Sequence, residues 1–386
     1  MNKNKIKIVV ACDSFKGSLS SAGVANAAAE GIRTILPDAE IWRVPVADGG
    51  EGTMSMLVDA LNGRYEAVAV SDPLGRKIQA SYGIVSIGGI RSAIIEMSQA
   101  SGLTLLADDE RNPRATSSRG TGELIRHAFD AGCRSFIVGI GGSATNDGGA
   151  GMLRALGLRF LDRAGNELPE GGSALRFLDS IDLADARNEI LKCPFTVLCD
   201  VDNPLVGENG ASAVFGPQKG SSPDDVVLLD TSLARYGDCL RDVTGKDVAS
   251  RPGAGAAGGM GAAFYAFFNS EMRPGIDTAL DIIGFPAMLK DADLVITGEG
   301  KLDRQTLSGK APMGILRCAL RSGVPVVAIG GAVEEADSLT AAGFAAVLSV
   351  QQRALPLVEA MKPEVAANNV SATVSQIIRL FFKDRI

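Results

Sequence analysis

The sequence has little of several residue types on which common catalytic sites depend. It contains one histidine, one tryptophan and four tyrosines among 386 residues. Because His127 is the only histidine, metal sites built from several histidines are excluded. Ser-His-Asp and Cys-His hydrolases are also excluded if His127 has no catalytic role. Its helical spacing with Glu123, Arg126 and Asp130 indicates a polar outer face. We therefore expect His127 to be solvated and without a catalytic role.

Other features that the sequence lacks restrict the kinds of molecule that the protein can bind. The six cysteines form no C-x-x-C pair and have no partner histidines, so we expect reduced, mostly buried thiols rather than a zinc site or a disulfide scaffold. No apolar run approaches the about 18 residues of a membrane span. A net charge of −7 without a basic cluster argues against nucleic acid and anionic membranes. These features favour a cytoplasmic protein that acts on a small molecule, and a homo-oligomer is compatible with them.

Glycine is what the sequence has in excess. Its 46 glycines in 386 residues are about 12% of the chain, against a typical ~7%. The length exceeds the ~250 to 300 residues at which single cores tend to split, so two domains are expected.

Short apolar runs that alternate with helical patterns predict an α/β fold at both ends of the chain. A helix is expected after Ser20, with Pro37 as its stop. The expected strands are 6–11, 41–46 and 65–70 near the start, and 294–297, 324–329 and 345–350 near the end. These runs are continuous, as is typical of parallel strands that are buried on both faces.

The two ends are expected to form one domain that the middle of the chain interrupts. We predict a discontinuous flavodoxin-like or Rossmann-like α/β domain with a parallel sheet, made of residues 1–71 and 284–386. The less regular residues 72–283 contain the turn signal Asp72-Pro73-Leu74-Gly75 and further strand patterns. They are expected to form an inserted second α/β domain.

The expected strand ends carry the chemistry. In open α/β sheets, ligands bind beyond the carboxyl ends of the strands. Five such ends combine carboxylates with glycines, at residues 13–18, 48–53, 141–149, 200–203 and 298–303. Phosphoryl transfer needs carboxylates for Mg²⁺, donors around the phosphates and a group that positions the attacking hydroxyl. Glycines admit phosphate to backbone N–H groups, and Lys16, Lys219, Lys301 and Lys310 would add positive charge. One such loop alone is typical of a plain turn, whereas five together favour a phosphate site.

Two familiar nucleotide motifs are missing. The Gly309-Lys310 pair has Arg304 where a P-loop needs its first glycine. Residues 253–258 spell G-x-G-x-x-G but follow Arg251-Pro252 rather than a strand. A packing turn or hinge is therefore the preferred interpretation, and a nicotinamide-dependent dehydrogenase is disfavoured. The aromatic cluster at 264–268 is expected in the core.

Long motifs of the sequence resemble those of the bacterial glycerate kinases of the D-glycerate 2-kinase type. The opening motifs are DSFKGSLS at 13–20 and PVADGGEGT at 45–53. Similar blocks follow in family order at 141–151, 199–204, 214–220, 252–261 and 297–310. The resemblance extends from about residue 7 to residue 382.

This resemblance implies ATP-dependent phosphorylation of D-glycerate, at the 2-hydroxyl, to 2-phospho-D-glycerate. It further implies Mg²⁺, a discontinuous flavodoxin-like domain with an inserted second domain, and a place in glyoxylate or sugar-acid breakdown. A glycerate 3-kinase or a kinase of a related hydroxy acid stays open as an alternative. A non-catalytic two-domain anion-binding protein is the alternative of another class, and it would release no ADP.

Roles of single residues are hypotheses. Asp200 is expected to position or deprotonate the glycerate hydroxyl, and Lys16 and Asp303 complete the expected catalytic set. Asp147 or Asp303 is expected to hold Mg²⁺. The expected nucleotide-phosphate loop comprises Gly141, Gly142, Ser143, Thr145, Asn146, Asp147 and Gly148. The expected substrate-binding residues are Ser14, Lys16, Asp48 and Glu51, of which Ser14 and Lys16 would bind the carboxylate.

Overall fold

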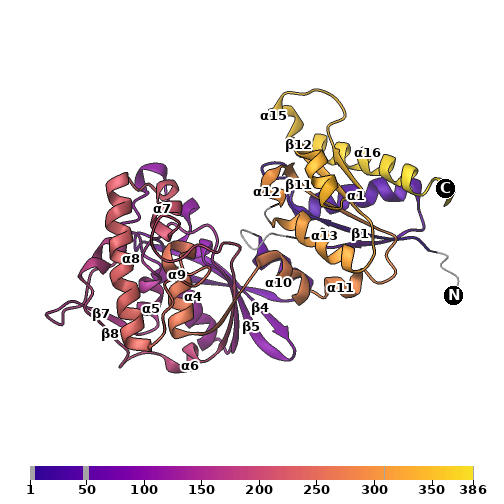
Figure 1. Cartoon of the computed structure of the whole chain (residues 1–386). Helices are drawn as coiled ribbons and strands as arrows, with labels where there is room; N and C mark the ends of the chain where they lie inside the picture. Colours follow the sequence, from indigo (N-terminus) through magenta and orange to yellow (C-terminus); the bar gives the residue numbers. More distant parts are fainter. Residues whose placement is uncertain (1–4, 47–51, 308, 386) are drawn as a thin grey trace. The chain divides into compact units, whose positions relative to one another are not determined.

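The computed structural model describes residues 5–46, 52–307 and 309–385 (Figure 1). The chain divides into two compact units. Unit 1 comprises Met1–Asp48 and Ile276–Ile386, and unit 2 comprises Gly49–Gly275.

Unit 1 is built on a five-stranded parallel sheet, which confirms the predicted fold class. Its strands are β1 (Lys7–Cys12), β2 (Glu40–Arg43), β11 (Leu294–Leu302), β12 (Val326–Val333) and β13 (Ala346–Ser349). Their order across the sheet is β13-β12-β11-β1-β2, and every neighbouring pair is parallel. Counted along the chain within this sheet, the order is the 2-1-3-4-5 of flavodoxin-like folds, whose direction reverses at β1.

Helices cover both faces of this sheet. The helix α1 (Ser21–Ile35) begins where predicted, because the Ser20 hydroxyl accepts a hydrogen bond from Gly23 N at 3.1 Å. Side chains of α1 and α16 (Pro363–Phe381) pack in one core with Ile8 and Val10 of β1. The remaining helices are α10 (Gly275–Ile282), α11 (Phe285–Met288), α12 (Arg304–Leu307), α13 (Ala311–Arg321), α14 (Ala336–Ala342), α15 (Leu357–Ala360) and the 3-10 helix η5 (Lys383–Arg385).

Unit 2 contains a mixed six-stranded sheet in the order β10-β9-β6-β5-β4-β3. The meander β3 (Arg64–Ser71), β4 (Lys77–Ile87) and β5 (Ile90–Glu96) is antiparallel. From β5 onward, the strands β6 (Ser135–Gly139), β9 (Pro194–Leu198) and β10 (Asn269–Arg273) are parallel. A separate hairpin-like pair joins β7 (Arg159–Leu161) to β8 (Ser180–Asp182).

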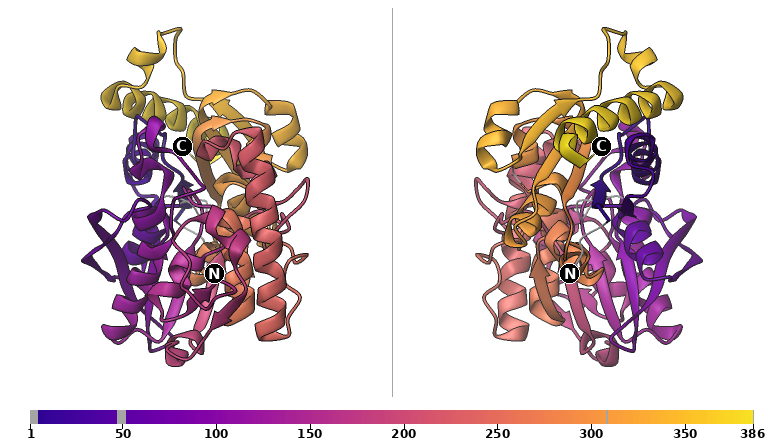
Figure 2. Two further views of the ribbon diagram at one scale, coloured as in Figure 1. Left: turned by 90° about the vertical axis from the view of Figure 1, so that its left-hand side faces the viewer. Right: turned by 90° about the vertical axis from the view of Figure 1, so that its right-hand side faces the viewer.

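The helices of unit 2 pack around this sheet. The 22-residue α8 (Pro223–Thr244) is the longest helix of this unit (Figures 1 and 2). It starts with a capping box at Ser222 and Asp225. The others are α2 (Thr53–Ala60), α3 (Ser98–Ser101), α4 (Arg119–Asp130), α5 (Ala150–Ala155), α6 (Asn188–Leu191), α7 (Ala211–Phe215), α9 (Ala256–Phe267) and the 3-10 helices η1 (Leu103–Leu105), η2 (Asp108–Glu110), η3 (Gly172–Phe177) and η4 (Pro217–Lys219).

The unit boundaries differ from the expected ranges 1–71, 72–283 and 284–386. The strand expected at 65–70 does not join the sheet of β1, because β3 pairs with β4 from Arg64 to Ser71. At the other boundary, α10 belongs to unit 1 from Ile276 onward. A Cβ atom on Gly314 of α13 would lie 2.5 Å from Ile276, which shows how closely α10 packs on α13.

Three further expectations can be compared with unit 2. The expectation that His127 is solvated is wrong, because its ring is half-buried and its Nδ1 lies 3.0 Å from the hydroxyl of the buried Tyr82. The aromatic cluster is confirmed as core, since Phe264 and Phe268 pack on Phe195. The G-x-G-x-x-G segment is confirmed as a packing turn, since a Cβ atom on Gly258 would lie 2.0 Å from a backbone oxygen.

No helix in the described parts of the chain combines the length and apolar character needed to cross a membrane.

The close packing of α1 on α16 gives a stability prediction. A Cβ atom on Gly31 would lie 2.3 Å from the backbone oxygen of Ser371, so Gly31→Ala forces the two helices apart. We expect unit 1 to lose about 1–3 kcal/mol of unfolding free energy. Urea denaturation followed by the fluorescence of Trp42, which lies on β2 of unit 1, measures this loss.

The matched control is Gly23→Ala in the same helix, where the nearest atom is the Ser20 hydroxyl at 3.3 Å. This variant should stay within about 1 kcal/mol of the unsubstituted protein. Equal stability of the two variants would contradict the assigned helix contact.

Candidate functional site

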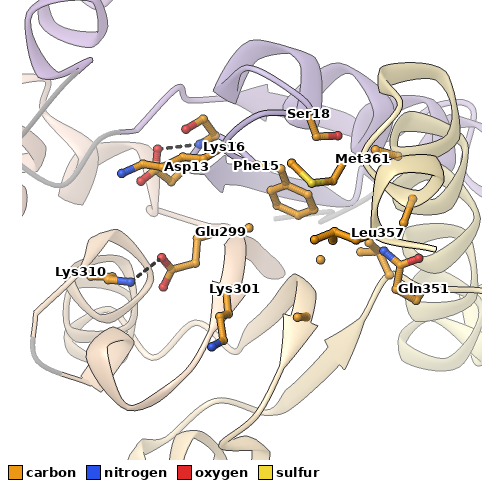
Figure 3. Close-up of a pocket in the computed structure, with 17 residues that line it drawn as sticks. Asp13, Phe15, Lys16, Ser18, Glu299, Lys301, Lys310, Gln351, Leu357 and Met361 are labelled. Atoms are coloured by element: carbon orange, nitrogen blue, oxygen red, sulfur yellow. Dashed lines mark hydrogen bonds and ion pairs between the residues drawn. The ribbon is translucent and has the colours of Figure 1, made fainter. Parts of the chain in front are cut away.

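Four parallel strands of unit 1 share one edge of its sheet, where the last residues of β11 and β12 and the segments after β1 and β13 line a pocket (Figure 3). The register places Cys12 of β1 beside Gly298 of β11, and Gly330 of β12 beside Ser349 of β13. The pocket has a volume of about 330 Å³. Its lining residues with polar side chains are Asp13, Ser14, Lys16, Ser18, Glu299, Lys301, Lys310 and Gln351. Its apolar lining residues include Phe15, Val350, Leu357, Ala360, Met361 and Ala366.

The loop after β1 is held in one shape by its own backbone. Asp13 N donates to the Gly298 carbonyl at 2.8 Å, and Ser14 N donates to the Asp13 carboxylate at 2.6 Å. Phe15 N donates to the Leu19 carbonyl, and Gly17 completes the turn with φ +75°. The predicted residues Ser14 and Lys16 therefore both face the pocket.

Glu299 is a buried acid of this pocket whose two oxygens both have partners. It is buried, its Oε1 accepts a hydrogen bond from the Thr306 hydroxyl at 2.7 Å, and its Oε2 lies 3.3 Å from Lys310 Nζ (Figure 3). Burial raises the pKa of Glu299, and the bonds from Thr306 and Lys310 oppose this rise. The sequence analysis included Glu299 only within the segment 298–303 and gave it no role of its own, and the structure places it inside β11 rather than after the end of that strand.

Asp303 does not line the pocket but starts the short helix α12. Its Oδ1 accepts a hydrogen bond from Gln305 N at 2.9 Å, and its backbone N donates to Thr306 Oγ1 at 3.0 Å. Its Oδ2 lies 3.7 Å from Lys301 Nζ. Asp303 therefore shares Thr306 with Glu299, which places it one contact away from the pocket lining.

In unit 2, most of the predicted phosphate loop lies inside the protein. Gly141 and Gly142 are exposed, whereas Ser143 is largely buried and residues 144–149 are fully or almost fully buried. Gly148 N donates to the Gly258 carbonyl, and a Cβ atom on Gly148 would lie 2.4 Å from the Tyr236 ring. The prediction that this loop binds phosphate therefore depends on Gly141 and Gly142, because the later residues form packing contacts.

Asp147 organises the interior of this loop. The residue is 1% exposed, and its Oδ2 accepts hydrogen bonds from Ser118 N and Ser118 Oγ at 2.8 Å and from Gly151 N at 3.1 Å. Its Oδ1 accepts from Gly149 N at 3.1 Å. Burial raises the pKa of Asp147, and these donors oppose the rise. Such a carboxylate, with donors on both oxygens, is arranged for holding the loop rather than for open coordination of a metal.

Lys219, at the end of η4, is a second buried charged residue and contacts this loop. It is 2% exposed, and its ammonium donates to Ser143 Oγ and to the Thr145 carbonyl, both at 2.7 Å. Burial lowers the pKa of Lys219 from 10.5 to about 7, and the negative charge of Asp147 opposes this fall. Lys219 therefore holds the buried part of the loop at Ser143 and Thr145.

Asp200 lies at the same sheet edge as the two exposed glycines. The register pairs Gly139 of β6 with Leu198 of β9. Gly141 lies two residues after Gly139, and Asp200 lies two residues after Leu198. Asp200 is exposed, and its Oδ1 accepts a hydrogen bond from Gly275 N at 2.8 Å. The structure thus brings the predicted base and the start of the predicted loop together.

The predicted site residues therefore separate into groups. Ser14 and Lys16 belong to the pocket of unit 1, Gly141, Gly142 and Asp200 share an edge of unit 2, and Asp48 and Glu51 lie outside the described residues. Ser118, which holds Asp147, was not predicted, because its contact with a loop 29 positions away has no local sequence signal. Across the described ranges, no three His, Cys, Asp or Glu side chains gather as a metal site.

Comparison with known proteins identifies the family. The model of the glycerate kinase family matches residues 8–382. A glycerate kinase of Bacillus subtilis (strain 168) is 45% identical over 373 residues, which cover 96% of this chain and 97% of the relative. A glycerate 2-kinase of Escherichia coli (strain K12) is 44% identical over 376 residues, which cover 96% of this chain and 98% of the relative.

A solved structure agrees with these relatives. A crystal structure of a chain from Salmonella typhimurium LT2, provisionally named glycerate kinase 2, superposes with a TM-score of 0.89 at 47% identity. It covers 99% of this chain and 100% of its own. The protein is thus an enzyme chain that belongs to the glycerate kinase family.

Proposed function

We propose that this enzyme transfers the terminal phosphoryl group of ATP to the 2-hydroxyl of D-glycerate, forming 2-phospho-D-glycerate and ADP. The observation that carries this proposal is the similarity along almost the whole chain to glycerate kinases, one of which is named a glycerate 2-kinase. The hydroxyl proton leaves as the new O–P bond forms and the bond to the ADP oxygen breaks. Cytoplasmic ATP is the natural donor, and six free cysteines fit a reducing compartment.

Asp200 is our proposed acceptor of the hydroxyl proton. One of its oxygens is fixed by Gly275 N, which orients the carboxylate, and the side chain is exposed to an incoming substrate. A carboxylate in this role positions the nucleophile in other phosphoryl-transfer enzymes. The exposed backbone of Gly141 and Gly142, at the same sheet edge, would support the group being transferred.

Magnesium would be held by carboxylates beside the nucleotide phosphates, where it neutralises their charge. Asp13 and Glu299 both line the pocket of unit 1, and carboxylate oxygens are the ligands that this ion prefers. We propose these two acids ahead of Asp147, which is 1% exposed, does not line this pocket and accepts four internal hydrogen bonds. Asp303 keeps its predicted metal role as a second candidate, since it contacts Glu299 through Thr306.

The proposed reaction predicts ADP release that depends on D-glycerate. A coupled assay with ATP and Mg²⁺ should show this release with D-glycerate and only background without acid. Nuclear magnetic resonance of the product should show phosphate on the 2-oxygen.

The other outcomes separate the alternatives. Phosphate on the 3-oxygen would identify a 3-kinase, and release with another hydroxy acid only would revise the substrate. Absence of release with all tested acids would contradict the proposed reaction.

Replacement of Asp200 tests the proposed proton acceptor. Asp200→Asn keeps an oxygen for Gly275 N but removes the basic charge, so the fold should persist. We expect kcat to fall by roughly 10²- to 10⁴-fold, measured by the same assay. The matched control is Asp202→Asn, at an exposed position two residues after Asp200, and it should change kcat by less than about threefold. Comparable kcat values for the two variants would remove Asp200 from the mechanism.

The lowered pKa of Lys219 predicts a pH-dependent stability. Between pH 7 and 10.5 the unfolded chain binds more protons at this lysine than the folded chain, so stability rises as the pH rises. From pH 7 to 8.5, the rise should be about 2 kcal/mol larger in the unsubstituted protein than in Lys219→Met. Urea denaturation followed by circular dichroism at several pH values measures this difference.

Lys192→Met, which removes an exposed lysine of the same unit, should keep the slope of the unsubstituted protein. An identical pH slope in Lys219→Met would show that Lys219 stays charged in the folded state at neutral pH.

A further inference from the structure

The pocket of unit 1 has two ends of different chemistry. Figure 3 shows Glu299, Lys301 and Lys310 at one end, and Leu357, Met361 and the amide of Gln351 at the other. The exposed Lys16 adds a cation to the polar lining. A ligand that fills the pocket must therefore combine an anionic part with a flat or apolar part.

D-glycerate does not meet this requirement. All three of its carbons carry oxygen, so it has no apolar surface to bury against Leu357 and Met361. The volume of about 330 Å³ also exceeds the need of so small an acid, because cavities of roughly 300 to 1,000 Å³ hold ligands of drug size. A nucleoside with its first phosphates matches both the size and the division of the lining.

The apolar end is open for a planar group. Leu357 lines the pocket although its side chain is 72% exposed, so a ligand could cover apolar surface that now faces water. Phe15 and Met361 face the same space (Figure 3). A Cβ atom on Gly17 would lie 2.7 Å from Met361 Cε, so the loop after β1 and the end of α15 pack closely enough to form one wall.

Gln351 supplies a polar group at this apolar end. It lines the pocket directly after the end of β13, and within the described residues its side-chain amide has no hydrogen-bond partner. An amide offers one acceptor and two donors, the pattern that pairs with the edge of an adenine. The pocket also lies at β1, where the strand order of the sheet reverses, the place at which open α/β sheets bind ligands.

We infer that this pocket binds the purine nucleotide, with the base between Phe15, Leu357 and Met361 and the phosphates toward Lys16 and Lys310. Lys16 then serves phosphate rather than the glycerate carboxylate. The inference rests on the proposed kinase function, because that function supplies the nucleotide.

The experiment compares two neighbouring exposed residues. Leu357→Glu places a charge against the base, whereas Val358→Glu alters a residue that is 77% exposed and outside the lining. Fluorescence titration with a methylanthraniloyl derivative of ADP, without any acid substrate, gives nucleotide affinity. Steady-state assays give KM for ATP and for D-glycerate.

We expect Leu357→Glu to weaken nucleotide binding and to raise KM for ATP at least tenfold, with KM for D-glycerate within twofold of its normal value. Val358→Glu should leave all three values within twofold. Equal nucleotide affinities of the two variants would overturn the inference, and so would a rise confined to KM for D-glycerate.

A substitution of Lys16 tests the same pocket assignment independently of Leu357→Glu. Lys16→Ala should raise KM for ATP and leave KM for D-glycerate unchanged, while Lys383→Ala, an exposed lysine elsewhere in unit 1, should change neither. The reverse pattern for Lys16→Ala would return this residue to the glycerate carboxylate and remove it from the nucleotide site.

The results distinguish a failure of the proposed function from a failure of the pocket assignment. Nucleotide binding that Leu357→Glu weakens, in a protein without glycerate-dependent ADP release, would keep the nucleotide pocket and reject the acid substrate. Normal glycerate kinase activity with an unaffected Leu357→Glu variant would keep the function and reject the pocket assignment.

Discussion

Parallel pairing between strands distant in the sequence is the constraint on which both candidate sites depend. In unit 1, Thr297 Oγ1 donates to the Ala11 carbonyl across 286 positions, within the pairing of β1 with β11. In unit 2, β6 and β9 pair so that Gly139 lies beside Leu198. Because parallel strands point the same way, their carboxyl ends share an edge, and short loops from separate parts of the chain meet there. The chemistry follows from the register, since one changed pairing would separate Asp13 from Glu299 or Gly141 from Asp200.

Buried charge then decides which part of a polar loop can meet a ligand. Asp147 and Lys219 lie inside unit 2, and each has its hydrogen bonds satisfied by the loop or by Ser118. A fully bonded polar group in a low-dielectric interior is strongly held, whereas an unbonded one is costly. The loop from Gly141 to Gly149 is consequently a scaffold for most of its length, with a short exposed tip formed by its first two glycines.

The sequence predicted the elements better than their partners. The strands near 6–11 and 294–297 and the helix after Ser20 appear where expected, because apolar runs and a capping hydroxyl are local signals. The strand β3 was expected in the wrong sheet, since its apolar pattern does not say which strand it pairs with. His127 was misjudged for a related reason: its helical face is polar in sequence, but Tyr82 comes from a strand 45 positions away.

For the site, the family motifs identified the loops but not their orientation. A glycine-rich run looks the same in sequence whether its glycines admit a phosphate or a neighbouring part of the protein. Gly148 and Gly258 belong to the second kind, because a Cβ atom on either would collide with Tyr236 or with Thr145. Glu299 and Gln351 become candidates only because they line the pocket, whose walls come from both chain segments of unit 1.

The insertion of unit 2 between β2 and β11 has a consequence for the order of assembly during translation. Synthesis proceeds from the N-terminus, and all strands of the six-stranded sheet, from Arg64 to Arg273, emerge before Leu294. Unit 2 can thus complete its own core on the ribosome. During that interval β1, which is fully apolar from Ile8 to Cys12, has β2 on one side and an open edge on the other. This edge stays unpaired until β11, which begins at Leu294, has been made, so for most of synthesis β1 (Lys7–Cys12) is exposed to pairing with a strand of another chain.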